Sequence, residues 1–312
     1  MTLSGRHGTQ HEITVAAAAG SVYRLLADVR QWPHVFPPTV HVDRLEGDER
    51  TERIRIWATA NGVVKNWISR RDLFPEELRI AFRQEVSAAP IASMGGEWII
   101  GTTGDGQSRV RLVHDYEAVS PEEVAWIEET VDRNSRAELE ALRTHLEAAR
   151  AGEELAFSFE DTVEVDGGAQ DVYDFIDRAD LWPERLPHVA KVKLVREPDG
   201  VQTLEMDTRA HGATHTTKSY RVPLPNHCLA YKQVTLPSLL SVHTGCWTVA
   251  PRDGGVTVSS QHTVVLDAGN IAPVLGEDAA VSDARKHVQD ALSGNSRVTL
   301  EHAKQYAEAR RR

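Results

Sequence analysis

The sequence contains two copies of one pattern, about 150 residues apart. The segments Val22–Pro37 and Val172–Pro187 share five identical residues in 16 positions, including a Trp-Pro pair. The identical pairs are Val22/Val172, Tyr23/Tyr173, Trp32/Trp182, Pro33/Pro183 and Pro37/Pro187. A single repetition of this length indicates a duplicated domain, because solenoids repeat shorter units several times. We therefore expect two domains of one fold, residues 1–150 and 155–312.

The ends of the two copies match as well. Asn134-Ser135-Arg136 recurs as Asn295-Ser296-Arg297, now at a spacing of 161 residues. About 11 residues have therefore been inserted in the second copy, and Gly269–Asp278 is the expected place. The joint is expected near Ala149–Leu155, where a helical pattern stops at a glycine.

Each copy predicts a strand, a short helix, a series of strands and a long amphipathic helix. In the first copy, Ser21–Val29 is the short helix, which Trp32-Pro33 is expected to end. Apolar residues at helical spacing from Val124 to Leu146 predict the long helix. Alternating runs predict strands at Ile13–Ala16, Arg53–Trp57, Val64–Arg71, Leu78–Gln84, Trp98–Thr102 and Arg109–Tyr116. This order predicts an α+β fold, twice, in which a curved antiparallel sheet packs on one helix and leaves a cavity.

Residues two apart on a strand share a face, and one such triplet recurs. The triplets are Trp67, Ser69, Arg71 and Thr217, Ser219, Arg221, and Trp98 and Trp247 follow the arginines at 27 and 26 residues. A single strand tryptophan usually belongs to the core, and a single strand arginine usually faces water. Because the triplet and the later tryptophan recur at matching places in both copies, we expect these side chains to face a cavity. A cavity-facing arginine would need an anionic or carbonyl-rich ligand, because its charge is costly to bury unpaired.

A histidine is expected on an inward face of another strand. Its neighbours on that face, Val110 and Leu112, are apolar, so His114 is expected to point inward, either as a proton carrier or as a core histidine. In the second copy, Ser260 aligns best with His114, and His262 follows two residues later on the same face.

Composition excludes several classes of protein. A net charge of −11 disfavours nucleic acid and anionic membranes as partners. The two cysteines exclude a disulfide scaffold or a four-cysteine zinc site and fit a reducing cytosol. No apolar window approaches 18 residues, and the polar N-terminus lacks the apolar core of a signal peptide, so we expect a cytoplasmic protein without a transmembrane helix.

These motifs together resemble the aromatase/cyclases of bacterial type II polyketide synthases. The resemblance is carried by Trp32-Pro33, Val35–Val40, Trp67–Arg71, Trp98 and the Asn-Ser-Arg helix. It covers both copies, which implies the di-domain subclass. It also implies tandem helix-grip domains, the fold of START and Bet v 1 proteins, and no metal or organic cofactor.

The resemblance further implies an enzyme that acts on a poly-β-ketone carried by an acyl carrier protein, together with other type II synthase components. The expected reaction is C7–C12 first-ring aldol cyclisation, dehydration of that ring to the aromatic state, or both. The alternatives are a non-catalytic helix-grip carrier of a hydrophobic ligand or ketide, and a chain in which only one half is catalytic. The segment Lys286–Arg312, expected to be a helix that ends in Arg310-Arg311-Arg312, is a candidate docking patch for the carrier protein, or simply a solvated helix end with favourable charges.

The resemblance assigns roles to individual residues. The expected catalytic residues are Arg71, Ser69, His114, its acidic partner Asp132, Arg221 and Ser219. The expected substrate-binding residues are Trp67, Trp98, Trp32, Thr39, Trp247 and His262. Thr39 stands where one relative has a pocket tyrosine, and Thr217 replaces the tryptophan of the first copy, so the two pockets are expected to be unequal.

Overall fold

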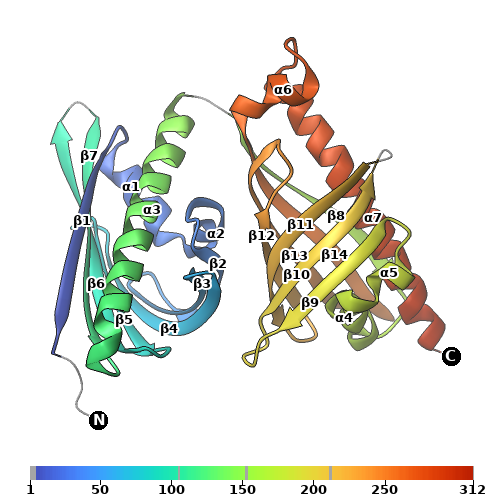
Figure 1. Ribbon diagram of the computed structural model, residues 1–312, viewed down its shortest axis with the longest axis horizontal. Coiled ribbons are helices and arrows are strands. Elements are labelled where there is room, and N and C mark those ends of the chain that lie inside the picture. Colours follow the sequence, from blue (N-terminus) through green and yellow to red (C-terminus); the bar gives the residue numbers. More distant parts are fainter. Residues whose placement is uncertain (1–4, 105, 152–153, 211–212, 312) are drawn as a thin grey trace. The chain divides into compact units, whose positions relative to one another are not determined.

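The structure, a computed structural model, describes residues 5–104, 106–151, 154–210 and 213–311. The chain divides into two compact units, Met1–Glu153 and Glu154–Arg312, and each holds one copy of the repeat (Figure 1). Each unit contains a seven-stranded antiparallel sheet, two or more short helices and one long helix. This confirms the predicted α+β tandem helix-grip fold.

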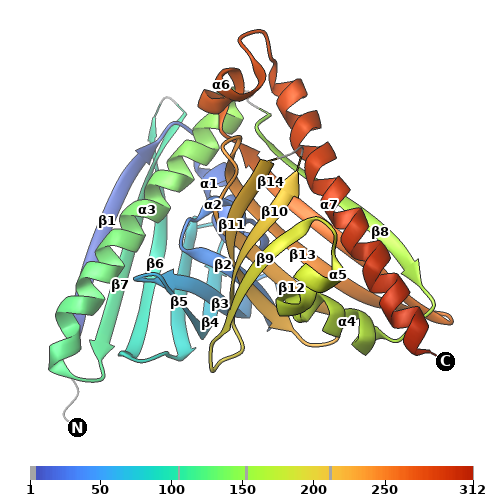
Figure 2. The same cartoon turned by 45° about the vertical axis from the view of Figure 1, so that its right-hand side comes forward.

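The first unit orders its strands β1-β7-β6-β5-β4-β3-β2. The strands are β1 (His7–Val15), β2 (Thr39–Gly47), β3 (Thr51–Ala60), β4 (Val63–Phe74), β5 (Arg79–Val86), β6 (Ile91–Gly104) and β7 (Gln107–Ala118). The helices are α1 (Ala19–Ala27), α2 (Trp32–Val35) and α3 (Val124–Ala151). Helix α3 packs against β1 and β7 and lies across the sheet (Figure 2). Strand β2 was not predicted from the sequence, and its second half is exposed and charged.

The second unit repeats this order as β8-β14-β13-β12-β11-β10-β9. Its strands are β8 (Ala156–Val165), β9 (Val189–Arg196), β10 (Gln202–Ala210), β11 (Ala213–Leu224), β12 (Cys228–Thr235), β13 (Leu240–Arg252) and β14 (Gly255–Leu266). Its helices are α4 (Ala169–Asp177), α5 (Trp182–Arg185), α6 (Ile271–Leu275) and α7 (Val281–Arg310). Helix α6 lies where the insertion was expected.

The Trp-Pro pairs begin a second short helix instead of ending the first one. Helix α1 stops at Ala27, and Pro33 lies in the first turn of α2, where its missing N–H removes no helical hydrogen bond. The indole N–H of Trp32 donates to the carbonyl of Leu26 at 3.2 Å. Trp182 makes the equivalent bond to Phe175 at 3.0 Å, so in each unit the tryptophan joins the two short helices.

The two cysteines and the end of the first long helix can also be compared with their predictions. Cys228 and Cys246 are joined as a disulfide between β12 and β13, which the low cysteine count did not lead us to expect. Helix α3 ends at Ala151, and the glycine that was expected to stop it, Gly152, lies outside the described residues.

Candidate functional site

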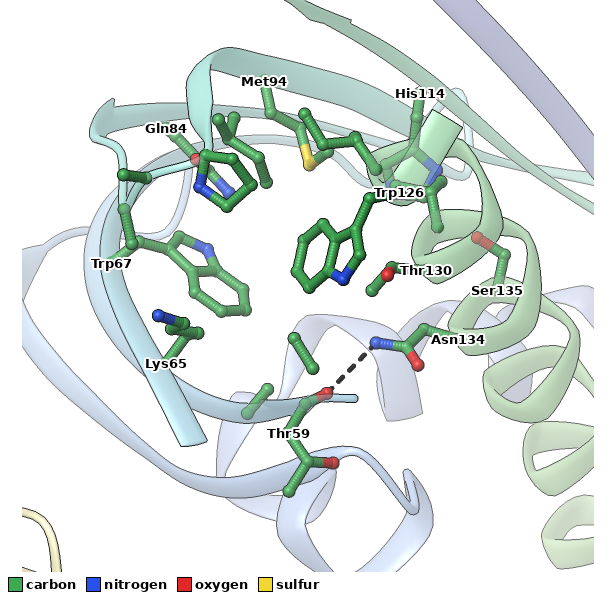
Figure 3. Close-up of a pocket in the computed structure, with 18 of the residues that line it drawn as sticks. Thr59, Lys65, Trp67, Gln84, Met94, His114, Trp126, Thr130, Asn134 and Ser135 are labelled. Carbon is green, nitrogen blue, oxygen red and sulfur yellow. Dashed lines mark hydrogen bonds between the residues drawn. The ribbon is translucent and has the colours of Figure 1, made fainter. Parts of the chain in front are cut away.

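The N-terminal unit holds a cavity of two adjoining chambers between its sheet and α3. The larger has a volume of about 130 Å³ and the smaller about 90 Å³. They share five lining residues, Trp67, Gln84, Met94, His114 and Glu138. Figure 3 shows the larger chamber, with the indole rings of Trp67 and Trp126 turned into it. We call the two chambers together the N-terminal cavity.

Most of the predicted residues of the first copy meet in the smaller chamber. Its lining includes Trp32, Trp67, Ser69, Arg71, Trp98 and His114. Thr39 is buried at the start of β2 but is not among the described residues that line either chamber. The structure therefore gives no support to Thr39 as a substrate-binding residue.

Arg71 already has protein partners, contrary to the expectation that its buried charge needs a ligand. Its Nη1 donates to Glu52 Oε1 at 2.6 Å and to the carbonyl of Ala27 at 3.3 Å, and its Nη2 donates to the carbonyl of Leu26 at 2.6 Å. These carbonyls end α1, so Arg71 caps that helix. Burial lowers the Arg71 pKa to about 10, which leaves the guanidinium charged at neutral pH. Three of its five N–H donors are used, so at most two can reach a ligand.

Asp132 does not contact His114, so the predicted acid–histidine pair is wrong. Asp132 Oδ1 lies 2.8 Å from Nε2 of His11 on β1, and Arg136 donates to the same carboxylate. These two partners lower the Asp132 pKa to about 2. The residue is nearly half exposed and lines neither chamber, because it lies one position off the inward face of α3.

The acidic group of this cavity is Glu138, which sequence reasoning missed. The α3 residues that line the larger chamber recur at spacings of three and four: Trp126, Ile127, Thr130, Val131, Asn134, Ser135 and Glu138. That helical periodicity could have found Glu138 and excluded Asp132. Burial raises the Glu138 pKa to about 7, so its carboxyl exchanges a proton near neutral pH.

His114 is neutral at pH 7 in this cavity. Burial and the neighbouring His11 lower its pKa to about 4. Its ring packs edge-on against Phe82, with centroids 5.5 Å apart. The neutral imidazole carries one N–H donor and one acceptor nitrogen.

The C-terminal unit has one matching cavity of about 110 Å³, which we call the C-terminal cavity. The predicted residues that line it are Thr217, Ser219, Arg221, Trp247 and His262. Arg221 caps α4 as Arg71 caps α1, through a 2.6 Å bond to the carbonyl of Ile176. Its side-chain partner is Gln202 at 2.9 Å, where the first unit has Glu52.

The strand register corrects the alignment of the histidines. His114 pairs with Gly96, and His262 pairs with the matching Gly245. Ser260 pairs with Trp247, as Leu112 pairs with Trp98. His262 is therefore the structural counterpart of His114, and Ser260 is not.

Sequence reasoning also missed three polar residues around His262. His262 Nε2 lies 2.7 Å from Ser296 Oγ, and its Nδ1 lies 3.0 Å from the Tyr231 hydroxyl and 2.9 Å from His243 Nε2. All four residues line the C-terminal cavity. Burial lowers the His262 pKa to about 4 and that of His243 well below its usual value, so both rings are neutral at pH 7.

The structure also bears on metal binding, membrane spans and the arginines at the end of α7. The described residues contain no group of three or more side chains placed to hold a metal ion. None of the helices described is long and apolar enough to cross a membrane. Arg310 pairs with Asp171 at 2.8 Å and Arg311 donates to the carbonyl of Asp166, while Arg312 lies outside the described residues.

The family model "Polyketide cyclase / dehydrase and lipid transport" matches residues 6–147 and again residues 156–308. The chain belongs to this family. Among relatives of this polyketide cyclase/dehydrase, the granaticin polyketide synthase bifunctional cyclase/dehydratase of Streptomyces virginiae is 50% identical over 93% of this chain and 96% of its own. The actinorhodin counterpart of Streptomyces coelicolor is 46% identical over 97% and 98%.

Solved structures agree with the sequence comparison. The di-domain ARO/CYC BexL of the BE-7585A pathway superposes with a TM-score of 0.88 at 53% identity, covering 97% of this chain and 99% of its own. The di-domain ARO/CYC StfQ of the steffimycin pathway superposes with a TM-score of 0.87 at 35% identity over the same shares. This polyketide cyclase/dehydrase is therefore a di-domain aromatase/cyclase, an enzyme of type II polyketide biosynthesis.

Proposed function

We propose that the N-terminal cavity closes the first ring of a poly-β-ketone, joining C7 to C12 while the chain is attached to an acyl carrier protein of a cytoplasmic type II synthase. The relatives are named as cyclase/dehydratases of polyketide synthases, which supports a polyketide as the class of substrate. The observation that carries the proposal is that the Glu138 carboxyl lines both chambers of the cavity, together with aromatic walls and hydrogen-bond donors.

Aldol closure begins by removing a proton from a methylene between two carbonyls. A general base is most effective when its pKa lies near the working pH, which Glu138 satisfies. The resulting enolate needs donors at its oxygen. Ser69 and Arg71 line the smaller chamber, and the Ser69 hydroxyl and the N–H groups of Arg71 that bind neither α1 nor Glu52 would provide them.

The attacked carbonyl and the fold of the chain need their own groups. The neutral imidazole of His114 can donate its N–H to the carbonyl oxygen that becomes a hydroxyl. Trp67 and Trp98 are flat walls that restrict how the ketide folds. Holding two carbons in contact converts closure into an oriented intramolecular step, which selects the bond that forms.

The experiment combines a minimal type II synthase, its carrier protein and malonyl building blocks, with and without this enzyme, and analyses the products by liquid chromatography and mass spectrometry. We expect the enzyme to change the ring pattern to C7–C12 products. A change in total yield with an unchanged ring pattern would contradict cyclisation and would indicate a carrier.

The pH dependence of the same assay tests the base. Because the ionised form of Glu138 is active, we expect kcat/KM for ring closure to rise with pH through about 7. This rising limb is expected to vanish in Glu138→Gln, together with about 10²–10⁴-fold of the rate. A rising limb that survives the substitution would assign the base elsewhere.

A further inference from the structure

The C-terminal cavity differs from the N-terminal one by a set of polar replacements. Register and helix spacing match Phe82 with Tyr231, Met94 with His243 and Glu138 with Thr299. Among the described residues that line the C-terminal cavity, none is a carboxylate. Two apolar positions have thus become a phenol and an imidazole, while the carboxyl base has been lost.

The new groups join the shared histidine and serine in one buried chain. The Ser296 hydroxyl lies 2.7 Å from His262 Nε2, and the Tyr231 hydroxyl lies 3.0 Å from His262 Nδ1. An imidazole between two hydroxyls can accept a proton at one nitrogen while it donates from the other. His243 Nε2, at 2.9 Å from the same Nδ1, is placed to accept from it and so to keep the hydrogen of His262 on Nδ1.

We propose, on the premise of the polyketide substrate argued above, that Ser296, His262 and Tyr231 form a proton relay that dehydrates the cyclised ketide in the C-terminal cavity. Tyr231 is the acid at one end and Ser296, with His262, is the base at the other. His243 is a positioning residue that favours the tautomer of His262 from which the relay starts, with the hydrogen on Nδ1.

The relay balances without any added reactant. A hydrogen on the carbon next to a ketide carbonyl passes as a proton to Ser296 Oγ, whose own proton moves to His262 Nε2. His262 passes its Nδ1 proton to the Tyr231 oxygen as the phenol protonates the departing hydroxyl, which leaves as water. The C–H and C–O bonds break, and the C–H electron pair forms the new C=C bond. Each side chain ends with as many protons as it began with, and the hydrogen of His262, which has moved from Nδ1 to Nε2, returns to Nδ1 before the next turnover.

The burial of these groups favours such a coupled transfer over a stepwise one. A cationic His262 is disfavoured, because burial holds the pKa of its ring at about 4. Burial likewise raises the pKa of Tyr231, which disfavours a free phenolate, although the nearby Arg221 opposes that shift. In the relay neither charged form has to persist.

The test uses the full-length enzyme with substrate supplied by a minimal synthase and a C9 ketoreductase, and it measures the rate at which the cyclised alcohol loses water. We expect Tyr231→Phe and Ser296→Ala each to lower kcat for dehydration by about 10²-fold with KM unchanged, because the lost groups act only on the transferring protons. Phenylalanine already occupies the matching position 82, so Tyr231→Phe is expected to fold. Tyr306→Phe removes a hydroxyl from α7 outside the cavity, and we expect it to dehydrate at the wild-type rate.

Two results would overturn the relay. One is a wild-type rate of dehydration in either Tyr231→Phe or Ser296→Ala. The other is a loss confined to KM, which would make these hydroxyls substrate anchors. Both are distinct from failure of the proposed function, in which the wild-type enzyme itself leaves the products unchanged. Thermal unfolding followed by circular dichroism confirms that each variant is folded.

Discussion

At the scale of single residues, the recurring arginine has a structural role that the sequence did not reveal. Recurrence correctly placed Arg71 and Arg221 in cavities, since the pattern of a strand fixes which face a side chain takes. Their partners are carbonyls of helix ends 44 and 45 residues away, and pairing at that distance depends on the tertiary fold. The catalytic role of the two arginines and of Ser69 and Ser219 stays a prediction.

The cap makes a prediction about stability. Arg71→Ala removes the buried partner of Glu52 Oε1 and leaves the α1 carbonyls of Leu26 and Ala27 uncapped, while Arg44 still pairs with Glu52 Oε2 at 3.0 Å. Breaking a buried pair costs about 3–5 kcal/mol, and because Arg44 remains we expect a loss of about 3 kcal/mol. Glu52→Gln reproduces the arrangement that Arg221 has with Gln202, so we expect a much smaller loss. Urea unfolding followed by circular dichroism measures the free energy of unfolding of both variants. Equal losses of stability would contradict the role of Arg71 as the cap of α1.

Glu138 makes a second prediction, because its carboxyl binds a proton more tightly in the folded state. Its pKa is raised from 4.5 to about 7, so stability falls as pH rises through that window and stays lower above it. Glu138→Gln removes this penalty. We expect the variant to equal the wild type well below pH 4.5 and to exceed it above pH 7 by up to about 3 kcal/mol. Denaturant unfolding at several pH values checks this, and a constant difference across pH would contradict a raised pKa of Glu138.

At the scale of elements, the sequence predicted which segments form helices and strands better than it predicted their contacts. Alternation and helical spacing gave most strands of the first sheet and the long helix α3, because those patterns reflect burial of one face. Asp132 was wrongly expected to be an acidic group of the cavity, because Asp132 and Glu138, six residues apart, lie on different faces of α3. The match of Ser260 to His114 failed because a ladder register cannot be read from spacing along one strand.

Strand β13 makes an element-scale prediction at Gly245. A Cβ at this position would meet the ring and hydroxyl of Tyr231 and the carbonyl of Gln261. We expect Gly245→Ala to displace Tyr231, to cost about 1–3 kcal/mol of stability and to slow dehydration. Gly294 on α7 has open space around its Cβ, so Gly294→Ala is the matched control and is expected to be neutral or stabilising. Equal stability of the two variants would contradict the close contact at Gly245.

At the scale of the whole molecule, duplication has produced two cavities in matching positions that are lined by different polar side chains. The repeat was enough to predict the tandem fold and to suggest the family, because Trp-Pro, Ser-x-Arg and the Asn-Ser-Arg helix recur in order. The domain limits at 150 and 155 and the docking of the carrier protein stay predictions. What the repeat could not show is that a carboxyl lies in the first cavity and a phenol–imidazole chain in the second, since these depend on replacements at non-motif positions.

The most direct test compares Glu138→Gln and Tyr231→Phe in the same reconstituted synthase with a C9-reduced substrate, by product mass and ring pattern. We predict that Glu138→Gln loses the C7–C12 ring pattern, whereas Tyr231→Phe keeps it and accumulates a product heavier than the aromatic one by one water. Identical product profiles from the two variants would contradict the division of cyclisation and dehydration between the two cavities.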